Sequence, residues 1–200
     1  MADTKQNILL SALRLFAKDG YEAVSVSAIA GELGMTKGAL YKHYKNKRDI
    51  FDSIVECMRK KDAEKAADFE LPVGTADEMP NEYRSASLVN LIDYAKGQFR
   101  YWVEDDFASL FRRVLAIEQF RSDDMSQLYH QYLVSGPLGY TADLLSGIGV
   151  KNFYEKAAAL VGTMFLMYSV YDGAQNKEEV IARLDVCLDG FYEEWKGCQI

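Results

Sequence analysis

The sequence predicts an all-α protein of about nine helices, and three observations support this fold class. Apolar residues recur at helical spacing through most of the 200 residues. Only three prolines occur, all between Pro72 and Pro137, so long stretches on either side are free to be helical. No segment alternates between apolar and polar residues over a useful length, which is the pattern that a half-buried β-strand needs.

The first two helices have clear boundary signals. Asp3, with Gln6 three residues later, resembles a capping box at the start of the first helix, and Gly20 ends it. Ser25 can cap the second helix, which ends at Gly34. Apolar residues at helical spacing fill both segments: Ile8, Leu9, Ala12, Leu13, Phe16 and Ala17, then Val26, Ile29, Ala30 and Leu33.

Two further helices complete the N-terminal part. Thr36 caps a short third helix that runs to about Tyr44. Asn46 caps a fourth helix, which begins at Lys47 and connects this part to the rest of the chain. We therefore predict an N-terminal domain at residues 1–48 and a larger helical C-terminal domain at residues 49–200.

The C-terminal domain is predicted to contain five helices after a linker. Leu71–Asn81, with two prolines and a glycine, has the composition of a linker. A break is expected near Ser135–Pro137 and a turn at Gly147–Gly149. The predicted helices lie near residues 83–103, 107–121, 124–146, 153–173 and 177–196.

The charges are distributed unevenly. The chain has a net charge of −7, yet residues 1–50 hold eight Lys/Arg and five Asp/Glu, whereas the other 150 residues hold 15 and 25. Five bases and no acid lie between Thr36 and Arg48. A local basic patch matters more than the total charge for binding a polyanion, so the N-terminal domain is the part expected to meet DNA.

Several other classes of protein are disfavoured. The strongly apolar uncharged stretch Ala157–Tyr171 is 15 residues, which is short of the roughly 20 that a membrane span needs, and we expect a cytoplasmic protein. Two histidines and three cysteines without C-x-x-C spacing give no metal site, and we expect no cofactor. Catalytic motifs such as G-x-S-x-G, H-E-x-x-H and the P-loop are absent, so we expect no catalytic residues and an enzyme is only a remote alternative.

The second and third helices have the arrangement of a helix-turn-helix unit. They are joined by Gly34-Met35-Thr36, a short turn that contains glycine. At 100° per residue, Leu40 and Tyr44 share one side of the third helix and would anchor it in the core. The opposite side and its flanks carry the residues expected to face a major groove: Gly38, Ala39, Tyr41, Lys42 and Lys45.

The start of the fourth helix gives an independent indication. Lys47 and Arg48 lie in its first turn, where the helix macrodipole disfavours positive charge. A nearby DNA phosphate would relieve this conflict. His43 flanks the inward side of the third helix, so packing or a phosphate contact is expected of it rather than catalysis.

Residues Gly20–Phe51 resemble the DNA-binding domain of the tetracycline-repressor (TetR) family. The matching positions include Gly20-Tyr21-Glu22-Ala23, Ser25-Val26, Ile29-Ala30, Leu33–Tyr41, Tyr44, Lys47 and Asp49-Ile50-Phe51. The resemblance covers about a quarter of the chain. It implies phosphate contacts by Tyr41 and Lys47, and a DNA-facing set of Ser25, Ser27, Thr36, Lys37, Gly38, Ala39, Tyr41, Lys42 and Lys47. It also implies a homodimer that represses transcription from a palindromic operator until a small molecule binds.

The C-terminal domain is expected to hold the effector site and the dimer interface. Aromatic residues concentrate between Tyr94 and Tyr132, which favours a small aromatic or amphipathic effector, although ordinary core packing also accounts for them. The predicted pocket residues are Phe99, Trp102, Phe107, Phe111, Phe120, Tyr129, Tyr132 and Phe165. The last two helices are predicted to form a four-helix dimer interface through Leu160, Met164, Phe165, Tyr168, Leu184, Leu188, Phe191 and Tyr192.

The main prediction is therefore a ligand-responsive repressor whose partners are an operator duplex, a second copy of itself and an unidentified effector. An activator, or a regulator that needs no ligand, would have the same N-terminal domain, and the sequence does not separate these alternatives.

Overall fold

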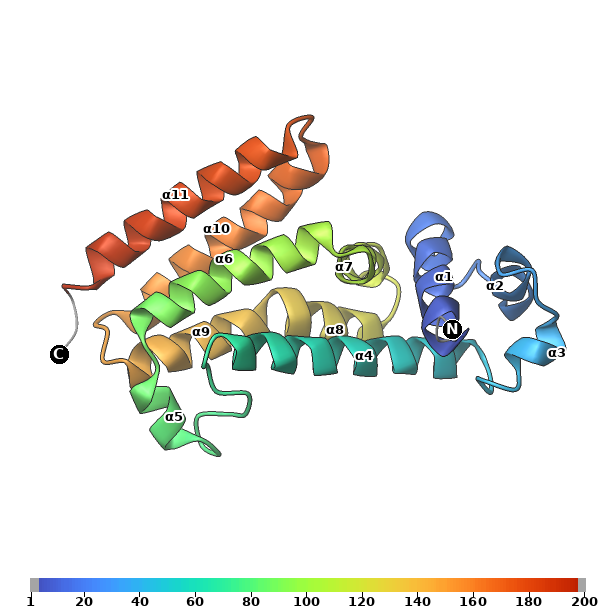
Figure 1. Ribbon diagram of the computed structural model, residues 1–200, viewed down its shortest axis with the longest axis horizontal. Helices are drawn as coiled ribbons and strands as arrows, with labels where there is room; N and C mark the ends of the chain where they lie inside the picture. Colours follow the sequence, from blue (N-terminus) through green and yellow to red (C-terminus); the bar gives the residue numbers. More distant parts are fainter. Residues whose placement is uncertain (1–3, 198–200) are drawn as a thin grey trace. The chain divides into compact units, whose positions relative to one another are not determined.

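The computed structural model describes residues 4–197, and its regular structure in this range is eleven α-helices without a β-strand, as predicted (Figure 1). The predicted cap residue Asp3 and Cys198 lie outside the described residues. The helices are α1 Thr4–Asp19, α2 Val26–Glu32, α3 Lys37–Leu40, α4 Lys47–Asp68, α5 Pro80–Ser85, α6 Leu88–Glu104, α7 Asp106–Glu118, α8 Asp123–Leu133, α9 Ser135–Gly147, α10 Phe153–Gly173 and α11 Lys177–Trp195.

The two helices beyond the predicted nine arise from breaks in predicted segments. A short helix, α5, precedes α6 because Ala86 is extended and the Ser87 hydroxyl accepts a hydrogen bond from the amide of Asn90, which starts a new helix. The predicted segment 124–146 divides at Val134 into α8 and α9. Gly136 follows this break, where an added Cβ would lie 1.8 Å from the carbonyl oxygen of Gln131, so only glycine fits there.

The helices form two compact units. The first unit comprises residues 4–61 and 105–129, and the second comprises residues 62–104 and 130–197. This division differs from the predicted boundary at residue 48, because α7 packs against α1 and therefore belongs to the first unit. Sequence periodicity identified both helices but carried no information on their pairing.

The first unit is held together by an apolar core and one buried carboxylate. Side chains from α1, α2, α3, α4 and α7 are fully buried, among them Phe16, Ile29, Leu40, Phe51 and Phe111. The carboxylate of Glu118 at the end of α7 is 1% exposed. Its Oε1 accepts hydrogen bonds from the amide of Tyr21, at 3.0 Å, and from the guanidinium of Arg121, at 2.9 Å. Glu118 thus fixes α7 to the segment that joins α1 and α2.

Gly20 is favoured at this position by its backbone conformation. Its φ of +85° lies in the left-handed region, where it ends α1. An added Cβ would also lie 2.5 Å from Nη1 of Arg121 and 3.1 Å from Oε1 of Glu118.

Replacing Glu118 with alanine is expected to destabilise the protein by about 1–3 kcal/mol, because the partly buried amide of Tyr21 would lose its acceptor. Glu118→Gln keeps an oxygen at that position and should cost less. Urea unfolding at pH 7 measures both variants, and an alanine variant within about 0.5 kcal/mol of the native protein would contradict the structural role given to Glu118.

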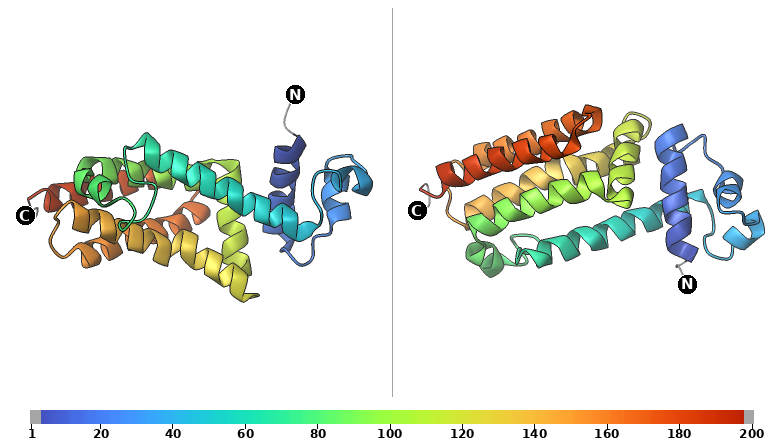
Figure 2. Two further views of the ribbon diagram at one scale, coloured as in Figure 1. Left: turned by 90° about the horizontal axis from the view of Figure 1, so that it is seen from below. Right: turned by 45° about the horizontal axis from the view of Figure 1, so that its top comes forward.

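The second unit is built around α6, α9, α10 and α11. Figures 1 and 2 both show α10 and α11 side by side and antiparallel. Leu144, Leu160, Leu184, Leu188 and Trp195 form part of the core of this unit. No helix in the described range is both long and apolar enough for a membrane crossing. The same range contains no group of three or more His, Cys, Asp or Glu side chains arranged to hold a metal ion.

Candidate nucleic-acid interface

The helix-turn-helix unit predicted from the sequence is present in α2 and α3. The Ser25 hydroxyl accepts a hydrogen bond from the amide of Ala28, and that of Thr36 accepts one from the amide of Ala39, each at 3.1 Å. Both helices therefore begin at the predicted caps. Between them, Gly34 has a φ of +62°, a left-handed conformation that favours glycine in so short a turn.

One side of α3 and the turn that follows it anchors the helix. Leu40 is fully buried, Tyr44 is 6% exposed, and the Tyr44 hydroxyl donates a hydrogen bond to the carbonyl of Lys5 at 3.5 Å. The other side is not covered by the first unit, and Figure 1 shows α3 at the edge of that unit. The sequence-predicted DNA-facing residues around it are exposed, namely Ser25, Ser27, Thr36, Lys37, Gly38, Tyr41 and Lys42, whereas Ala39, His43 and Lys47 are half-buried.

Three lysines near α3 carry charge that no carboxylate neutralises. Among the described residues, Lys37, Lys42 and Lys45 form no ion pair, and the ammonium of Lys37 lies 5.7 Å from the ring centroid of Tyr41. All three are exposed. A surface on which unpaired cations surround a short exposed helix is suited to phosphate contacts. Lys45 was placed on this side by helical spacing but was not among the predicted site residues.

Lys47 is bound within the protein. Its ammonium donates hydrogen bonds to the carbonyls of Tyr21, at 2.7 Å, and of Glu22, at 3.2 Å, and lies 3.6 Å from the Glu22 carboxylate. It also lies 4.3 Å from the ring centroid of Tyr21, which packs on Phe16 and Phe51. Burial raises the pKa of Tyr21. Lys47 therefore fastens the segment between α1 and α2 to the start of α4.

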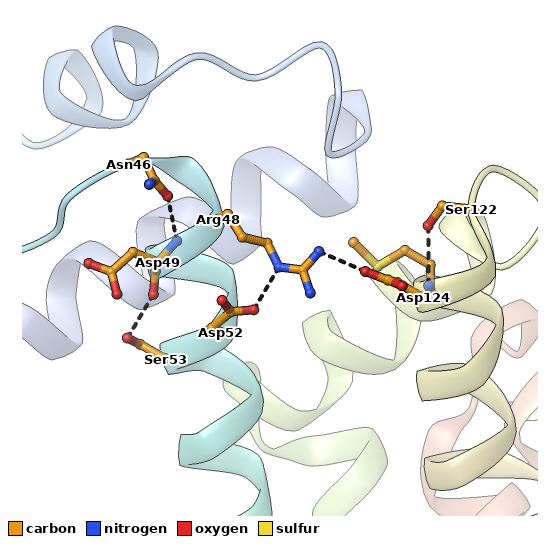
Figure 3. Close-up of polar contacts among 8 residues, drawn as sticks. Asn46, Arg48, Asp49, Asp52, Ser53, Ser122 and Asp124 are labelled. Carbon is orange, nitrogen blue, oxygen red and sulfur yellow. Dashed lines mark hydrogen bonds and ion pairs between the residues drawn. The ribbon is translucent and has the colours of Figure 1, made fainter.

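Arg48 is also paired internally, as Figure 3 shows. Its guanidinium donates to the carboxylates of Asp52 at 2.8 Å and Asp124 at 2.9 Å. The hydrogen bond with Asp124 makes the largest contribution to a raised pKa of Arg48. A DNA phosphate near Lys47 and Arg48 was predicted because the macrodipole of α4 disfavours positive charge in its first turn. Carbonyl and carboxylate acceptors within the protein relieve this conflict. That prediction loses its physical basis, and a phosphate contact by Lys47 now rests on the family resemblance alone.

Gly38 has no structural reason to be glycine within the described chain. An added Cβ would meet only the Thr36 hydroxyl, at 4.0 Å, and the backbone φ is not positive. We therefore expect Gly38→Ala to leave the free energy of unfolding unchanged or to raise it by up to about 1 kcal/mol. DNA affinity should fall at least tenfold, because the methyl group would occupy space that the duplex needs. Thermal unfolding and fluorescence anisotropy measure the two quantities, and unchanged affinity would remove Gly38 from the interface.

The predicted pocket residues are divided between the two units. Phe107, Phe111, Phe120 and Tyr129 belong to the first unit, whereas Phe99, Trp102, Tyr132 and Phe165 belong to the second. Phe120 is 88% exposed and Phe165 is 45% exposed, so neither lines an enclosed pocket in its own unit. Phe111 is fully buried as ordinary core. Phe99 stacks on Tyr168, with ring centroids 5.0 Å apart, and the ring centroids of Trp102 and Tyr132 are 6.2 Å apart.

Three of the predicted dimer residues are buried inside the single chain. Leu160, Leu184 and Leu188 are at most 2% exposed in the single chain, so they belong to its core and cannot form a surface. Met164, Tyr168, Phe191 and Tyr192 are half-buried, and only Phe165 of the predicted set is exposed. Other apolar residues of α10 and α11 are exposed, namely Leu166, Val170 and Val186. A helix that is apolar nearly all round does not reveal from its sequence which side faces its own core.

Comparison with known proteins supports the helix-turn-helix assignment. Residues 8–54 match the model of the bacterial regulatory proteins of the tetR family. The HTH-type transcriptional regulator AcrR of Shigella flexneri is 46% identical over 54 residues, which span 27% of this chain and about a quarter of that protein. The HTH-type transcriptional repressor AcnR of Corynebacterium diphtheriae is 26% identical over 169 residues, covering 78% of this chain and 88% of that protein.

The similarity of fold extends beyond the N-terminal helices. The crystal structure of a transcriptional regulator of the AcrR family from Aquifex aeolicus superposes with a TM-score of 0.69 at 17% identity, covering 94% of this chain and 98% of that one. Together with the capped helices α2 and α3 and the exposed lysines around them, these matches identify residues 8–54 as a tetR-family helix-turn-helix domain.

Proposed function

We propose that this protein is a ligand-responsive transcriptional repressor that binds a palindromic operator as a homodimer. The observation that carries the proposal is the exposed helix α3, which Leu40 anchors in the core and around which Lys37, Lys42 and Lys45 form no ion pair with any described residue. The name of the Corynebacterium relative, a transcriptional repressor, supports repression over activation.

A dimer is proposed because a single short recognition helix reads too few base pairs for specific binding. The outer face of α10 supplies a surface for it. Phe165, Leu166 and Val170 on this helix are 45%, 61% and 43% exposed, and Val186 on α11 is 72% exposed. Ala158, Ala159 and Gly162 continue the exposed face of α10 with small residues, over which a second helix can pack closely.

Repression is released, in this proposal, when a small aromatic or amphipathic molecule binds the second unit. Such a molecule must bind the DNA-competent and the released states with different affinity, because a ligand that binds both equally shifts nothing. The aromatic side chains of α6, α9 and α10 give the second unit the apolar lining that such a ligand requires.

The test of DNA binding is fluorescence anisotropy on duplexes from the region upstream of the protein's own gene, with a scrambled duplex of equal length as control. We expect the native sequence to be bound at least a thousandfold more tightly than the scrambled one at near-physiological salt. Equal affinity for the two duplexes, also at low salt, would contradict the proposal. Expression of a reporter from the same region, with and without the gene, distinguishes a repressor from an activator.

A further inference from the structure

Asp62, on the second half of α4, is a carboxylate without a cation. Its one hydrogen bond is to the side-chain amide of Gln98 on α6, with Nε2 of Gln98 donating to Oδ1 at 3.2 Å. Among the described residues no Lys, Arg or His pairs with it, whereas Asp185 and Asp189 of the same unit pair with Arg100 and Lys96. Asp62 is half-buried, and burial raises the pKa of its carboxyl group to about 7.

The side-chain amide of Gln98 also contains an oxygen that receives no hydrogen bond within the described chain. Its amide nitrogen is directed to Asp62, and its Oε1 is buried without a hydrogen-bond partner among the described atoms. A buried carbonyl oxygen without a donor is costly, and such groups in native structures usually have a partner. Asp62 and Gln98 together therefore present oxygens that lack donors, one of them on a group that can carry negative charge.

A cluster of aromatic rings lies next to this pair. Tyr94, on α6, is close enough to Asp62 for the carboxylate to contribute to the raised pKa of its phenol, after the larger effect of burial. The Tyr94 ring lies 5.9 Å from that of Phe69 and 6.1 Å from that of Tyr140. Phe69 approaches α6 at Gly97, the neighbour of Gln98, where an added Cβ would lie 2.7 Å from Phe69 Cζ.

Two other tyrosines of this cluster are held by hydrogen bonds from their hydroxyl groups, whereas Tyr94 has no such bond among the described residues. The hydroxyl of Tyr140 donates to the carbonyl of Pro72 at 2.9 Å, and that of Tyr83 donates to the carbonyl of Gly74 at 3.0 Å. Burial raises the pKa of Tyr83 to about 12, so this phenol stays uncharged at neutral pH. The Tyr94 hydroxyl has no hydrogen-bond partner among the described residues. It is a third polar group on which a ligand can bind.

We propose that Asp62, Gln98 and Tyr94 bind the ammonium group of an aromatic or amphipathic amine, which names the effector class of the regulator and rests on the proposed function. The ammonium would donate hydrogen bonds to the Asp62 carboxylate and to Oε1 of Gln98. Its positive charge would lie against the electron-rich faces of the neighbouring rings. The apolar part of the amine would pack among Phe69, Tyr94 and Tyr140.

The acceptors on this cluster select against other ligand classes. An anion would meet the carboxylate and a carbonyl oxygen at once, and among the described residues no cation pairs with Asp62 to offset the repulsion. A neutral apolar molecule would leave Oε1 of Gln98 buried without a donor and the Asp62 carboxylate without a cation. A protonated amine supplies the missing donors and the missing charge together.

The test uses 2-phenylethylamine, which like a lysine side chain is protonated at pH 8, and the neutral 2-phenylethanol, which has nearly the same shape. Isothermal titration of the DNA-free full-length protein at pH 8 should show the amine binding at least tenfold more tightly than the alcohol. Asp62→Asn keeps the shape of the side chain and should remove this preference. Asp93→Asn, at an exposed position on α6, changes the net charge equally and should preserve it.

Three results would overturn the proposal: no binding of the amine, equal binding of amine and alcohol, or an Asp62→Asn variant that retains the preference. The first is expected if Asp62 is only a protonated acid hydrogen-bonded to Gln98. Operator binding is measured separately on the same samples. A protein that binds the operator but not the amine contradicts only the amine site, whereas one that binds the amine but not the operator contradicts only the proposed function.

The pH dependence of stability checks the ionisation of Asp62 without any ligand. Because its pKa is raised from the usual 3.8 to about 7, the folded state holds this proton between these values and the unfolded state does not. Stability should therefore fall as pH rises from about 4 to about 7 and change little above that range. The two groups shown to interact with Asp62, the amide of Gln98 and the phenol of Tyr94, do not ionise there.

Asp62→Asn removes this titration, since asparagine carries no proton to lose. Its Tm should exceed that of the native protein by several degrees at pH 8, and the difference should close near pH 4. Equal Tm values for the two proteins across this range would mean that Asp62 is solvated like a surface carboxylate, and the cation site would then lose its charged group.

Discussion

Leu166→Glu is expected to leave the protein monomeric and to lower its affinity for a palindromic operator at least a hundredfold. Leu166 is 61% exposed and lies between Phe165 and Val170 on the outer face of α10. In a symmetric dimer each such substitution enters the interface twice, and two buried carboxylates without partners would oppose association. Operator affinity falls with it, because a monomer contacts only one half-site.

A matched control separates this effect from a general effect of surface charge. Val89, on α6, is another exposed aliphatic residue on a helix, at 47% exposure. Val89→Glu therefore adds the same negative charge as Leu166→Glu at a different part of the surface. Light scattering coupled to size exclusion should give a dimer for Val89→Glu and a monomer for Leu166→Glu. Circular dichroism checks that both variants are folded. A dimeric Leu166→Glu protein with native operator affinity would place the interface elsewhere.

The N-terminal helices could be predicted because their signals are local. Ser25 and Thr36 make the capping hydrogen bonds expected of them, and Gly20 and Gly34 adopt the left-handed conformations that end helices and allow tight turns. Each of these contacts joins residues at most a few positions apart. The anchor of α3 followed in part from periodicity: Leu40 and Tyr44 are both buried as predicted, but α3 ends at Leu40, and Tyr44 lies in the turn beyond it instead of in the predicted longer helix.

Contacts between distant residues could not be predicted. The hydrogen bond from the amide of Tyr21 to Glu118 spans 97 positions, and that from Gln98 to Asp62 spans 36. In the sequence, Glu118 and Asp62 are two of 30 acidic residues with nothing to distinguish them. The packing of α7 on α1 buries the first, and the packing of Asp62 beside Gln98 of α6 places the second where no ion pair forms among the described residues.

The aromatic and apolar residues of the C-terminal helices show a related limit. Their composition indicates burial, but not whether the side chain meets its own core, a ligand or a second chain. Leu184 and Val186 lie two positions apart on α11, yet one is 1% exposed and the other 72%. Helix periodicity places them on different sides without saying which side is outward. The predicted dimer set therefore contained core residues and omitted Leu166 and Val186.

Lys42→Ala and Lys47→Ala are expected to affect the protein in different ways, although both remove one lysine near α3. Lys42 is exposed and has no ion pair among the described residues. Its loss should leave stability within about 0.5 kcal/mol of the native value and weaken binding to all duplexes about equally. The slope of log affinity against log salt should become shallower by about 2 in the dimer, since each copy loses one phosphate contact.

Lys47→Ala should instead reduce stability by about 1–3 kcal/mol and leave the salt slope of the folded protein unchanged, because the Lys47 ammonium is hydrogen-bonded to the carbonyls of Tyr21 and Glu22. Urea unfolding and anisotropy over a range of salt concentrations measure both variants. A stable Lys47→Ala protein whose salt slope is shallower by about 2 would restore the phosphate contact implied by the family resemblance. Since both variants carry the same change in net charge, any difference between their slopes comes from where each ammonium lies.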